Sequence, residues 1–351
     1  MRVGLVGVGR IGAAHAQVVR RHPQVTTLRI ADAVPARARA VAQALDAEAL
    51  EHSDDVFRDV DAVIIAADTS AHAELLITAA RAGLPVFCEK PVAVDVAGTL
   101  RVLDEVSSAG VPNQIGFQRR FDAGYVAARE AVRSGALGEV RRAHVITADA
   151  APPPPEYVPT SGGIFRDCHV HDFDMLRWVT GHEVVEVYAT GANRGAEVFG
   201  ANDDVDESAA VLTLDDDTLA TLSGSRYNGA GYDVRMEIAG TAATYVVGLD
   251  EHAPLVSAEP AVKFPAGPAF REFWPRFEAA YEAEINHFIQ VARGAAASAC
   301  TVADALESFY VAEAATRSRR ERRPVTIDEV RATSGDGTDH PDSSKGATWT
   351  S

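Results

Sequence analysis

The chain has 351 residues, which at roughly 100–200 residues per domain favours two domains. Hydrophobic residues make up 47% and charged residues 24%, so the composition excludes global disorder. The net charge of −17 disfavours binding to nucleic acid or to an anionic membrane, because an acidic surface repels phosphates. The three cysteines are dispersed, which predicts a protein without disulfides. No apolar run has membrane length and there is no room for a signal peptide, so we expect a cytoplasmic enzyme.

The first third of the chain alternates between two periodicities. Short β-rich runs are separated by helical patterns of about a dozen residues, and the run at 60–67 is apolar throughout, as in a strand covered on both faces. This order predicts βαβ units and a parallel sheet. The runs lie at 2–8, 26–32, 60–67, 85–91 and 111–117, and the helical patterns at 12–23, 35–45, 70–82 and 95–109.

The pattern changes after a predicted helix at 123–133. Six runs between 141 and 249 alternate between apolar and polar residues, which predicts a large open, mostly antiparallel sheet covered on one side. Further helices are predicted at 167–180, 275–293 and 301–319. We therefore expect an α/β chain with a Rossmann domain over 1–120 and a substrate-binding and oligomerisation domain over 121–330. The last helix is expected to pack back on the first domain, and 332–351 to form a disordered tail.

A GxGxxG motif connects the first predicted strand to the first helix, at Gly7, Gly9 and Gly12. The glycines permit a tight turn, close approach of the backbone to a pyrophosphate, and close packing of helix on strand. Asp32 follows the second strand, where a carboxylate accepts hydrogen bonds from the ribose hydroxyls of NAD and repels the 2′-phosphate of NADP. The sequence therefore predicts NAD as cofactor, although Arg10 could contact a phosphate.

Two further elements carry groups suited to catalysis. Lys90 stands at the end of the predicted strand over 85–91, and ligands of open α/β sheets bind beyond the carboxyl ends of the strands. Asp167 and His171 stand at positions i and i+4 of a predicted helix, where a carboxylate could orient an imidazole and raise its basicity as a general base. The simpler interpretations are a solvated lysine and an aspartate that caps the helix.

Taken together, these motifs resemble the Gfo/Idh/MocA oxidoreductase family over about residues 1–330. The matching segments are GVGRIG at 7–12, CEKP at 88–91, GFQRRFDAGY at 116–125 and SGGIFRDCHVHDFDMLRW at 161–178. The proline-rich loop that ends in PPPPEY, together with SRYNGAGYDVR at 225–235, resembles the inositol 2-dehydrogenase branch.

The resemblance implies NAD-dependent oxidation of a ring hydroxyl of a cyclic polyol, most simply of myo-inositol to its 2-keto form, by a homotetramer that needs no metal. The tetramer would form through the sheet of the second domain. In this scheme His171 takes the hydroxyl proton, Lys90 stabilises the alkoxide, and Asp167 orients the histidine or binds a neighbouring hydroxyl. The implied cofactor contacts are Gly7, Gly9, Arg10, Ile11, Gly12, Asp32, Thr69, His72, Glu89 and Lys90, and the implied substrate contacts are Gln118, Arg119, Asp167, His171 and Tyr232.

Several alternatives stay open. The segment Ala148–Ala151 departs from the Ser-Arg-Asp-Pro stretch often found in that branch, so the substrate could be another sugar, a pyranose or an aminocyclitol. His169 could be a surface residue, or it could support the pocket from behind. Read with His171, it could also be half of a metal site for hydrolysis, and a non-catalytic NAD-binding sensor would use the same glycine loop.

Overall fold

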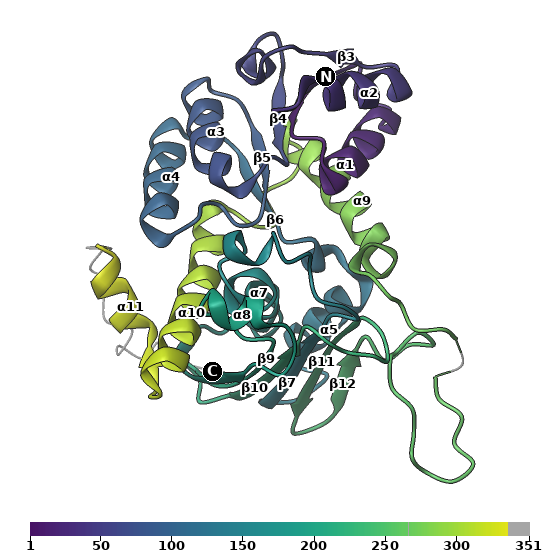
Figure 1. Ribbon diagram of the computed structural model, residues 1–351, viewed down its shortest axis with the longest axis vertical. Coiled ribbons are helices and arrows are strands. Elements are labelled where there is room, and N and C mark those ends of the chain that lie inside the picture. Colours follow the sequence, from purple (N-terminus) through teal and green to yellow (C-terminus); the bar gives the residue numbers. More distant parts are fainter. Residues whose placement is uncertain (266, 336–351) are drawn as a thin grey trace, which may run out of the picture.

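The computed structural model describes residues 1–265 and 267–335, which fold around two sheets (Figure 1). The first sheet has six parallel strands in the order β3-β2-β1-β4-β5-β6. The strands are β1 (Arg2–Val6), β2 (Thr27–Ala31), β3 (Glu48–Ala49), β4 (Ala62–Ile65), β5 (Val86–Glu89) and β6 (Asn113–Gly116).

Helices cover both faces of this sheet, as its apolar strands require. One face packs against α1 (Arg10–Arg21), α2 (Pro35–Leu45) and α9 (Phe273–Ala292). The other packs against α3 (Thr69–Arg81), α4 (Val96–Ala109) and the start of α10 (Val302–Glu321). The predicted parallel α/β architecture is confirmed, and the late helix α9 completes the core of the first sheet.

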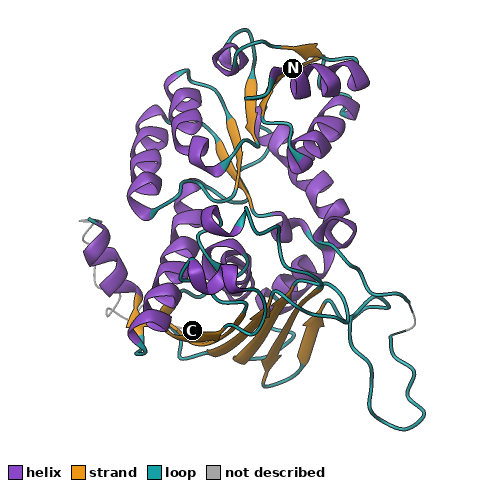
Figure 2. Cartoon of the chain, in the orientation of Figure 1, coloured by secondary structure: helices purple, strands orange, loops and turns teal. Residues whose placement is uncertain are grey.

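The second sheet has seven strands in the order β12-β11-β7-β10-β9-β8-β13, and all neighbouring pairs except β7 and β10 are antiparallel. Its inner face packs against α5 (Ala123–Arg133), α7 (Val170–Thr180) and α10. Within the described residues, no helix covers its other face (Figure 2). The strands are β7 (Val140–Ala148), β8 (Val184–Ala192), β9 (Glu207–Leu214), β10 (Leu219–Ser225), β11 (Asp233–Gly240), β12 (Thr244–Val247) and β13 (Val325–Thr326).

The predicted helix over 167–180 is in fact two helices, α6 (Ile164–Asp167) and α7. The short helix α8 (Glu197–Ala201) and the C-terminal α11 (Ile327–Ser334) were not predicted. Because α11 has a capping box between Thr326 and Glu329, residues 332–334 are helical rather than part of a disordered tail. The rest of that predicted tail, 336–351, lies outside the described residues. None of the described helices is long and apolar enough to cross a membrane.

Candidate active site

The glycine loop between β1 and α1 forms an open cradle. Gly7 has φ +91°, and a Cβ there would come within 2.4 Å of the Ala67 nitrogen. A Cβ on Gly12 would approach the Gly7 carbonyl oxygen to 2.0 Å, so strand and helix can meet only where these residues are glycine. Beside Gly9, by contrast, nothing lies within 4 Å of the Cβ position. This open space at a helix N-terminus suits a pyrophosphate.

Asp32 lies directly after β2, at the edge of the same cradle. Its carboxylate accepts hydrogen bonds from the backbone N–H groups of Val8 and Val34, both at 2.8 Å. The Arg37 guanidinium lies 3.7 Å away. These contacts orient the carboxylate and leave it lone pairs for ribose hydroxyls, so the cradle fits an NAD molecule.

Three more residues of the predicted cofactor set lie at helix starts around the cradle. Arg10 and Ile11 begin α1, and Thr69 begins α3. The Arg10 guanidinium stacks over the ring of Phe273, 4.6 Å from its centroid, so α9 holds the cradle from outside.

His72 is placed differently from the expectation. It is fully buried in α3, and its ring nitrogens lie 2.7 Å from the carbonyl oxygen of Pro91 and 3.1 Å from that of Ala67. Both polar atoms of the ring therefore face the backbone. The side chain ties the segment after β4 to the segment after β5, and so supports the end of the strand that carries Lys90.

Lys90 immediately follows β5 and reaches across to the second half of the chain. Its Nζ donates to the carbonyl oxygen of Asp167 at 3.0 Å and lies 3.5 Å from Asp167 Oδ1. The side chain is partly exposed, which leaves ammonium protons for a substrate oxygen.

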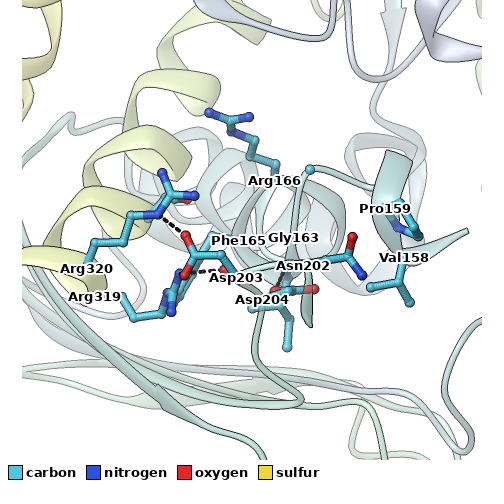
Figure 3. A pocket seen from close by; sticks show the side chains of 13 residues that line it. Val158, Pro159, Gly163, Phe165, Arg166, Asn202, Asp203, Asp204, Arg319 and Arg320 are labelled. Carbon is cyan, nitrogen blue, oxygen red and sulfur yellow. Dashed lines mark hydrogen bonds and ion pairs between the residues drawn. The ribbon is translucent and has the colours of Figure 1, made fainter. Parts of the chain in front are cut away.

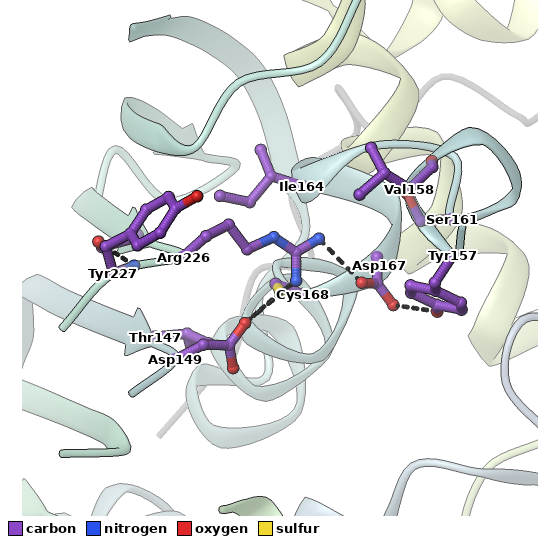
Figure 4. A network of polar contacts seen from close by, with 12 residues as sticks. Thr147, Asp149, Tyr157, Val158, Ser161, Ile164, Asp167, Cys168, Arg226 and Tyr227 are labelled. Carbon is purple, nitrogen blue, oxygen red and sulfur yellow. Dashed lines mark hydrogen bonds and ion pairs between the residues drawn. The ribbon is translucent and has the colours of Figure 1, made fainter. Parts of the chain in front are cut away.

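Asp167 is the centre of a polar cluster at the end of α6 (Figure 4). The Tyr157 hydroxyl donates to its Oδ1 at 2.9 Å, and Arg226 donates to its Oδ2 at 2.9 Å. Arg226 also donates to Asp149 at 3.1 Å. Burial opposes ionisation of Asp167, but the charges of Lys90 and Arg226 outweigh it and lower the pKa of the carboxyl. Asp167 is therefore a charged group held from three sides.

Sequence reasoning did not assign Tyr157 or Arg226 to the site. Each carries a weak signal: Tyr157 ends the proline run, and the guanidinium of Arg226 follows an alternating strand where the chain turns back. Asp149, in the segment that departs from the family pattern, lies in the same cluster through Arg226. That segment therefore contributes a carboxylate to the site.

His171 lies in the first turn of α7 and is buried. The ring of Phe117 contacts it edge-on at 5.6 Å, and its Nδ1 has no hydrogen-bond partner among the described residues. Burial, assisted by the charges of Lys90 and Arg119, lowers the pKa of His171 well below 6.5. The imidazole is therefore neutral near pH 7 and can accept a proton.

The expected pairing of Asp167 with His171 is wrong. The helix is interrupted at Cys168 and His169, so the two residues do not share one regular helical face. The Asp167 carboxylate bonds to Arg226 and Tyr157 instead, because a cation attracts a carboxylate more strongly than a neutral imidazole does. The site therefore lowers the basicity of His171 rather than raising it.

A second polar cluster lies behind the first and is sealed from solvent. Asp172 accepts from Arg119 and from the Thr147 hydroxyl, the latter at 2.7 Å. His169 lies between Asp172, at 2.7 Å from Nδ1, and Ser208, at 2.8 Å from Nε2. Arg119, which was expected to contact the substrate, is therefore buried in the interior and paired with Asp172. His169 is therefore a buried residue and not a surface residue, and its ring nitrogens are not aimed at His171.

Gln118 and Tyr232, the other predicted substrate contacts, also lie inside. Gln118 is 3% exposed, and its Oε1 has no partner among the described residues. Tyr232 packs edge-on against Phe277, and burial raises the pKa of its hydroxyl, with Arg119 opposing the rise. The unpaired Gln118 oxygen is a free acceptor near the end of β6.

A separate cavity of about 150 Å³ is lined by residues from the start of α6, from the segment after α8 and from the end of α10, among them Phe165, Asp204 and Arg319 (Figure 3). Asp203 on its wall is already paired with Arg319 and Arg320. None of the three catalytic candidates lines this cavity, so it is distinct from the site at Asp167.

Two family models match the chain. One, described as an oxidoreductase family with an NAD-binding Rossmann fold, covers residues 1–117, and the Gfo/Idh/MocA C-terminal domain covers residues 125–246. Myo-inositol dehydrogenase Hyg17 of Streptomyces leeuwenhoekii is 38% identical over 91% of this chain and 97% of its own. The chain belongs to the Gfo/Idh/MocA oxidoreductase family. The predicted family membership is thus confirmed.

Other relatives agree. Inositol 2-dehydrogenase of Rhizobium meliloti is 37% identical over 93% of this chain and 99% of its own. A crystal structure of scyllo-inositol dehydrogenase from Lactobacillus casei, with bound NAD(H) and scyllo-inositol, matches with a TM-score of 0.83 at 27% identity. That match covers 93% of this chain and 99% of the other. The predicted Rossmann domain and second α/β domain are confirmed as the architecture of this family.

Proposed function

We propose that this protein is an NAD-dependent dehydrogenase that oxidises one ring hydroxyl of a cyclic polyol, with myo-inositol as the first candidate. The observation that carries the proposal is that the ammonium group of Lys90, at the end of a strand of the sheet that carries the NAD cradle, lies beside the charged carboxylate of Asp167 and the neutral imidazole of His171. The names of the relatives support the substrate class.

In the proposed reaction, Lys90 and Asp167 bind adjacent oxygens of the ring. His171 accepts the hydroxyl proton, and Lys90 stabilises the alkoxide as the O–H bond breaks. When bound, NAD⁺ supplies the acceptor for the hydride that leaves the same carbon, which becomes a ketone. The low pKa of His171 means that the proton is readily passed on to solvent after each turnover.

Asp167 has a different role from the one expected for a partner of the base. Its contacts with Lys90, Arg226 and Tyr157 make it a positioning residue for the lysine, and its exposed edge is suited to accept a hydrogen bond from a ring hydroxyl. Arg226 in turn holds Asp167 and Asp149 at a fixed spacing. We propose that these five side chains form the substrate-binding wall.

The experiment that tests the function is a panel of cyclic polyols and sugars with purified protein and NAD⁺, monitored by NADH absorbance. We expect turnover of myo-inositol or scyllo-inositol and little turnover of open-chain alcohols. Turnover of open-chain alcohols without any ring polyol would overturn the substrate class. A protein that binds NAD⁺ and oxidises none of the panel would instead be the sensor alternative.

One observation favours a second candidate substrate. Asp149 places another carboxylate in the cluster, and burial raises its pKa despite the nearby guanidinium of Arg226. An ammonium group on the ring would pair with it, so an aminocyclitol is the second candidate. The panel distinguishes the two by the ratio of kcat/KM for an inositol and its amino analogue.

We also propose a homotetramer in the cytoplasm. The uncovered face of the second sheet carries exposed apolar side chains, among them Tyr188, Val211 and Leu219, which supports burial against another subunit. The three cysteines are free thiols, as suits a reducing compartment. Sedimentation of the purified protein tests the tetramer.

A further inference from the structure

A buried pair of titratable side chains lies outside the cluster around Asp167. His15 Nε2 is 2.6 Å from Glu89 Oε1, and the two side chains are 0% and 9% exposed. The carboxylate can only accept, so the ring N–H donates to it. The proposed reaction assigns no step to this contact.

The two residues come from the two elements that the reaction must hold together. His15 lies in α1, one helical turn after Gly12 of the cofactor cradle. Glu89 is the last residue of β5 and is joined by one peptide bond to Lys90. Glu89 pairs across the sheet with Gly116, where a Cβ would lie only 2.9 Å from Glu89 Oε2. Because Gly116 has no side chain, the Glu89 carboxylate has room to lie against it.

Helix α9 closes this region from outside. The Tyr281 ring lies 6.0 Å from the His15 ring and stacks on Trp274 at 5.0 Å, while Phe87 contacts His15 edge-on at 5.5 Å. Glu284 is also fully buried beside the pair. In such surroundings the hydrogen bond is shielded from competing water, so its geometry is well defined.

We propose that His15 and Glu89 are a positioning pair that fixes the separation between the NAD cradle and Lys90. The pair joins α1 to the end of β5 across the sheet edge where the cofactor binds. Lys90 can then reach the oxygen on the same substrate carbon that gives its hydride to the cofactor. Loss of the contact lets the strand end move relative to α1, and displacements of about 1 Å can lower rates by about 100-fold.

The kinetic test is a double-mutant cycle of Glu89→Gln, His15→Gln and the double variant. Each glutamine can still form a neutral hydrogen bond but removes the charged carboxylate or the imidazole. We expect each single change to lower kcat by about 10- to 100-fold, and the double variant to be no slower than the slower single variant, because both break the same contact. Glu89→Asp, which keeps the charge but shortens the reach, should remain impaired.

A matched control is Asp46→Asn, which removes an exposed ion pair with Arg20 at the other end of α1. Its kcat should equal that of the unchanged protein. Melting temperatures of all variants separate positioning from stability. A loss of kcat that simply follows the loss of folded protein, or fully additive single effects, would overturn the proposal.

The kinetic readout rests on the proposed oxidation, so a second readout avoids turnover. The chain contains only three lysines, at 90, 263 and 345, which makes acylation of Lys90 easy to follow by peptide mass spectrometry. We expect NADH to slow acylation of Lys90 in the unchanged protein but much less in Glu89→Gln, at NADH concentrations that saturate both. Exposed Lys263 serves as the internal reference.

The two readouts fail in different ways. Absence of polyol turnover in the unchanged protein, with NADH protection of Lys90 lost in the variants, would overturn the proposed function and support the positioning pair. Equal protection of Lys90 in Glu89→Gln and the unchanged protein would overturn the positioning pair whatever the substrate is.

Discussion

Two polar clusters lie on either side of the break between α6 and α7, and each contains an aspartate paired with an arginine. One cluster can bind a ligand, and the other stabilises the fold. Around Asp167, the side chains of Lys90 and Tyr157 present edges that a ligand can reach, while Arg226 holds the carboxylate from the interior. Around Asp172 the hydrogen bonds close on one another inside the protein. The comparison teaches that an aspartate and a histidine in one motif acquire their roles from the partners that the fold brings to them.

The largest expected effect is the loss of the base from the first cluster. His171→Ala should lower kcat by about 10²- to 10⁴-fold, because proton abstraction loses its acceptor. NADH binding should persist, since Asp32 and the glycine cradle are untouched. Steady-state kinetics and fluorescence titration with NADH measure the two effects.

The matched control is His182→Ala, which removes an exposed histidine that is paired with Asp215. Its kcat should remain that of the unchanged protein. A folded His171→Ala protein with the kcat of the control would show that His171 is not the base of the reaction.

Substitutions in the sealed cluster around Asp172 should lower the stability of the protein. Arg119→Met leaves Asp172 buried without its cation, and loss of one partner of a buried ion pair costs about 3–5 kcal/mol in the free energy of unfolding. Urea denaturation measures this cost. Arg2→Met, which breaks the exposed pair with Asp61, should change the free energy of unfolding little, because water screens that pair. Equal costs for the two variants would mean that the Asp172 cluster is not sealed.

The pH dependence of kcat/KM tests which charges act on His171. Asp167→Asn should lower kcat by roughly 10- to 100-fold, because the carboxylate charge that orders the substrate-binding side chains is lost. Lys90 keeps its hydrogen bond to the backbone carbonyl oxygen of residue 167, so the acidic limb of kcat/KM should stay where it is, below pH 6.5. The reason is that burial, followed by the charges of Lys90 and Arg119, lowers the pKa of His171, and Asp167 does not contribute to the shift.

Lys90→Met tests directly whether the charge of Lys90 contributes to the lowered pKa of His171. Removal of the ammonium charge should raise the pKa of His171, so that the acidic limb moves to higher pH. If Asp167→Asn instead moved the limb to lower pH, the carboxylate would be raising the basicity of His171, as the i,i+4 spacing predicted.

The sequence predicted the parts of this molecule that depend on local pattern. Apolar periodicity gave both sheets, and the glycine spacing with Asp32 gave the cofactor cradle. The break at Cys168 and His169 was invisible, because both residues keep right-handed helical backbone angles and carry no glycine or proline signal. The partners of Asp167 could not be predicted either, since Tyr157 and Arg226 reach it from other segments through tertiary contacts.

The last expected effect concerns a buried carboxyl that belongs to neither cluster. Both carboxyl oxygens of Glu284 lack a partner among the described residues, and burial, followed by the charges of Glu89 and Asp174, raises its pKa well above 4.5. A group whose pKa is raised by folding stabilises the folded state at low pH, and that stabilisation is lost as the pH rises toward the folded-state pKa.

Glu284→Gln keeps the shape of the side chain but cannot ionise, so the stability of the variant should not fall with rising pH in this way. We expect the variant to gain stability relative to the unchanged protein by up to about 1.4 kcal/mol for each pH unit above 4.5, until Glu284 ionises in the folded protein. Urea denaturation across this range measures the difference, and Glu282→Gln, on the exposed side of α9, should show none of this pH dependence. A stability difference that stays constant with pH would mean that Glu284 is charged in the folded protein. Its charge would then need a partner, as the charges of Asp167 and Asp172 do.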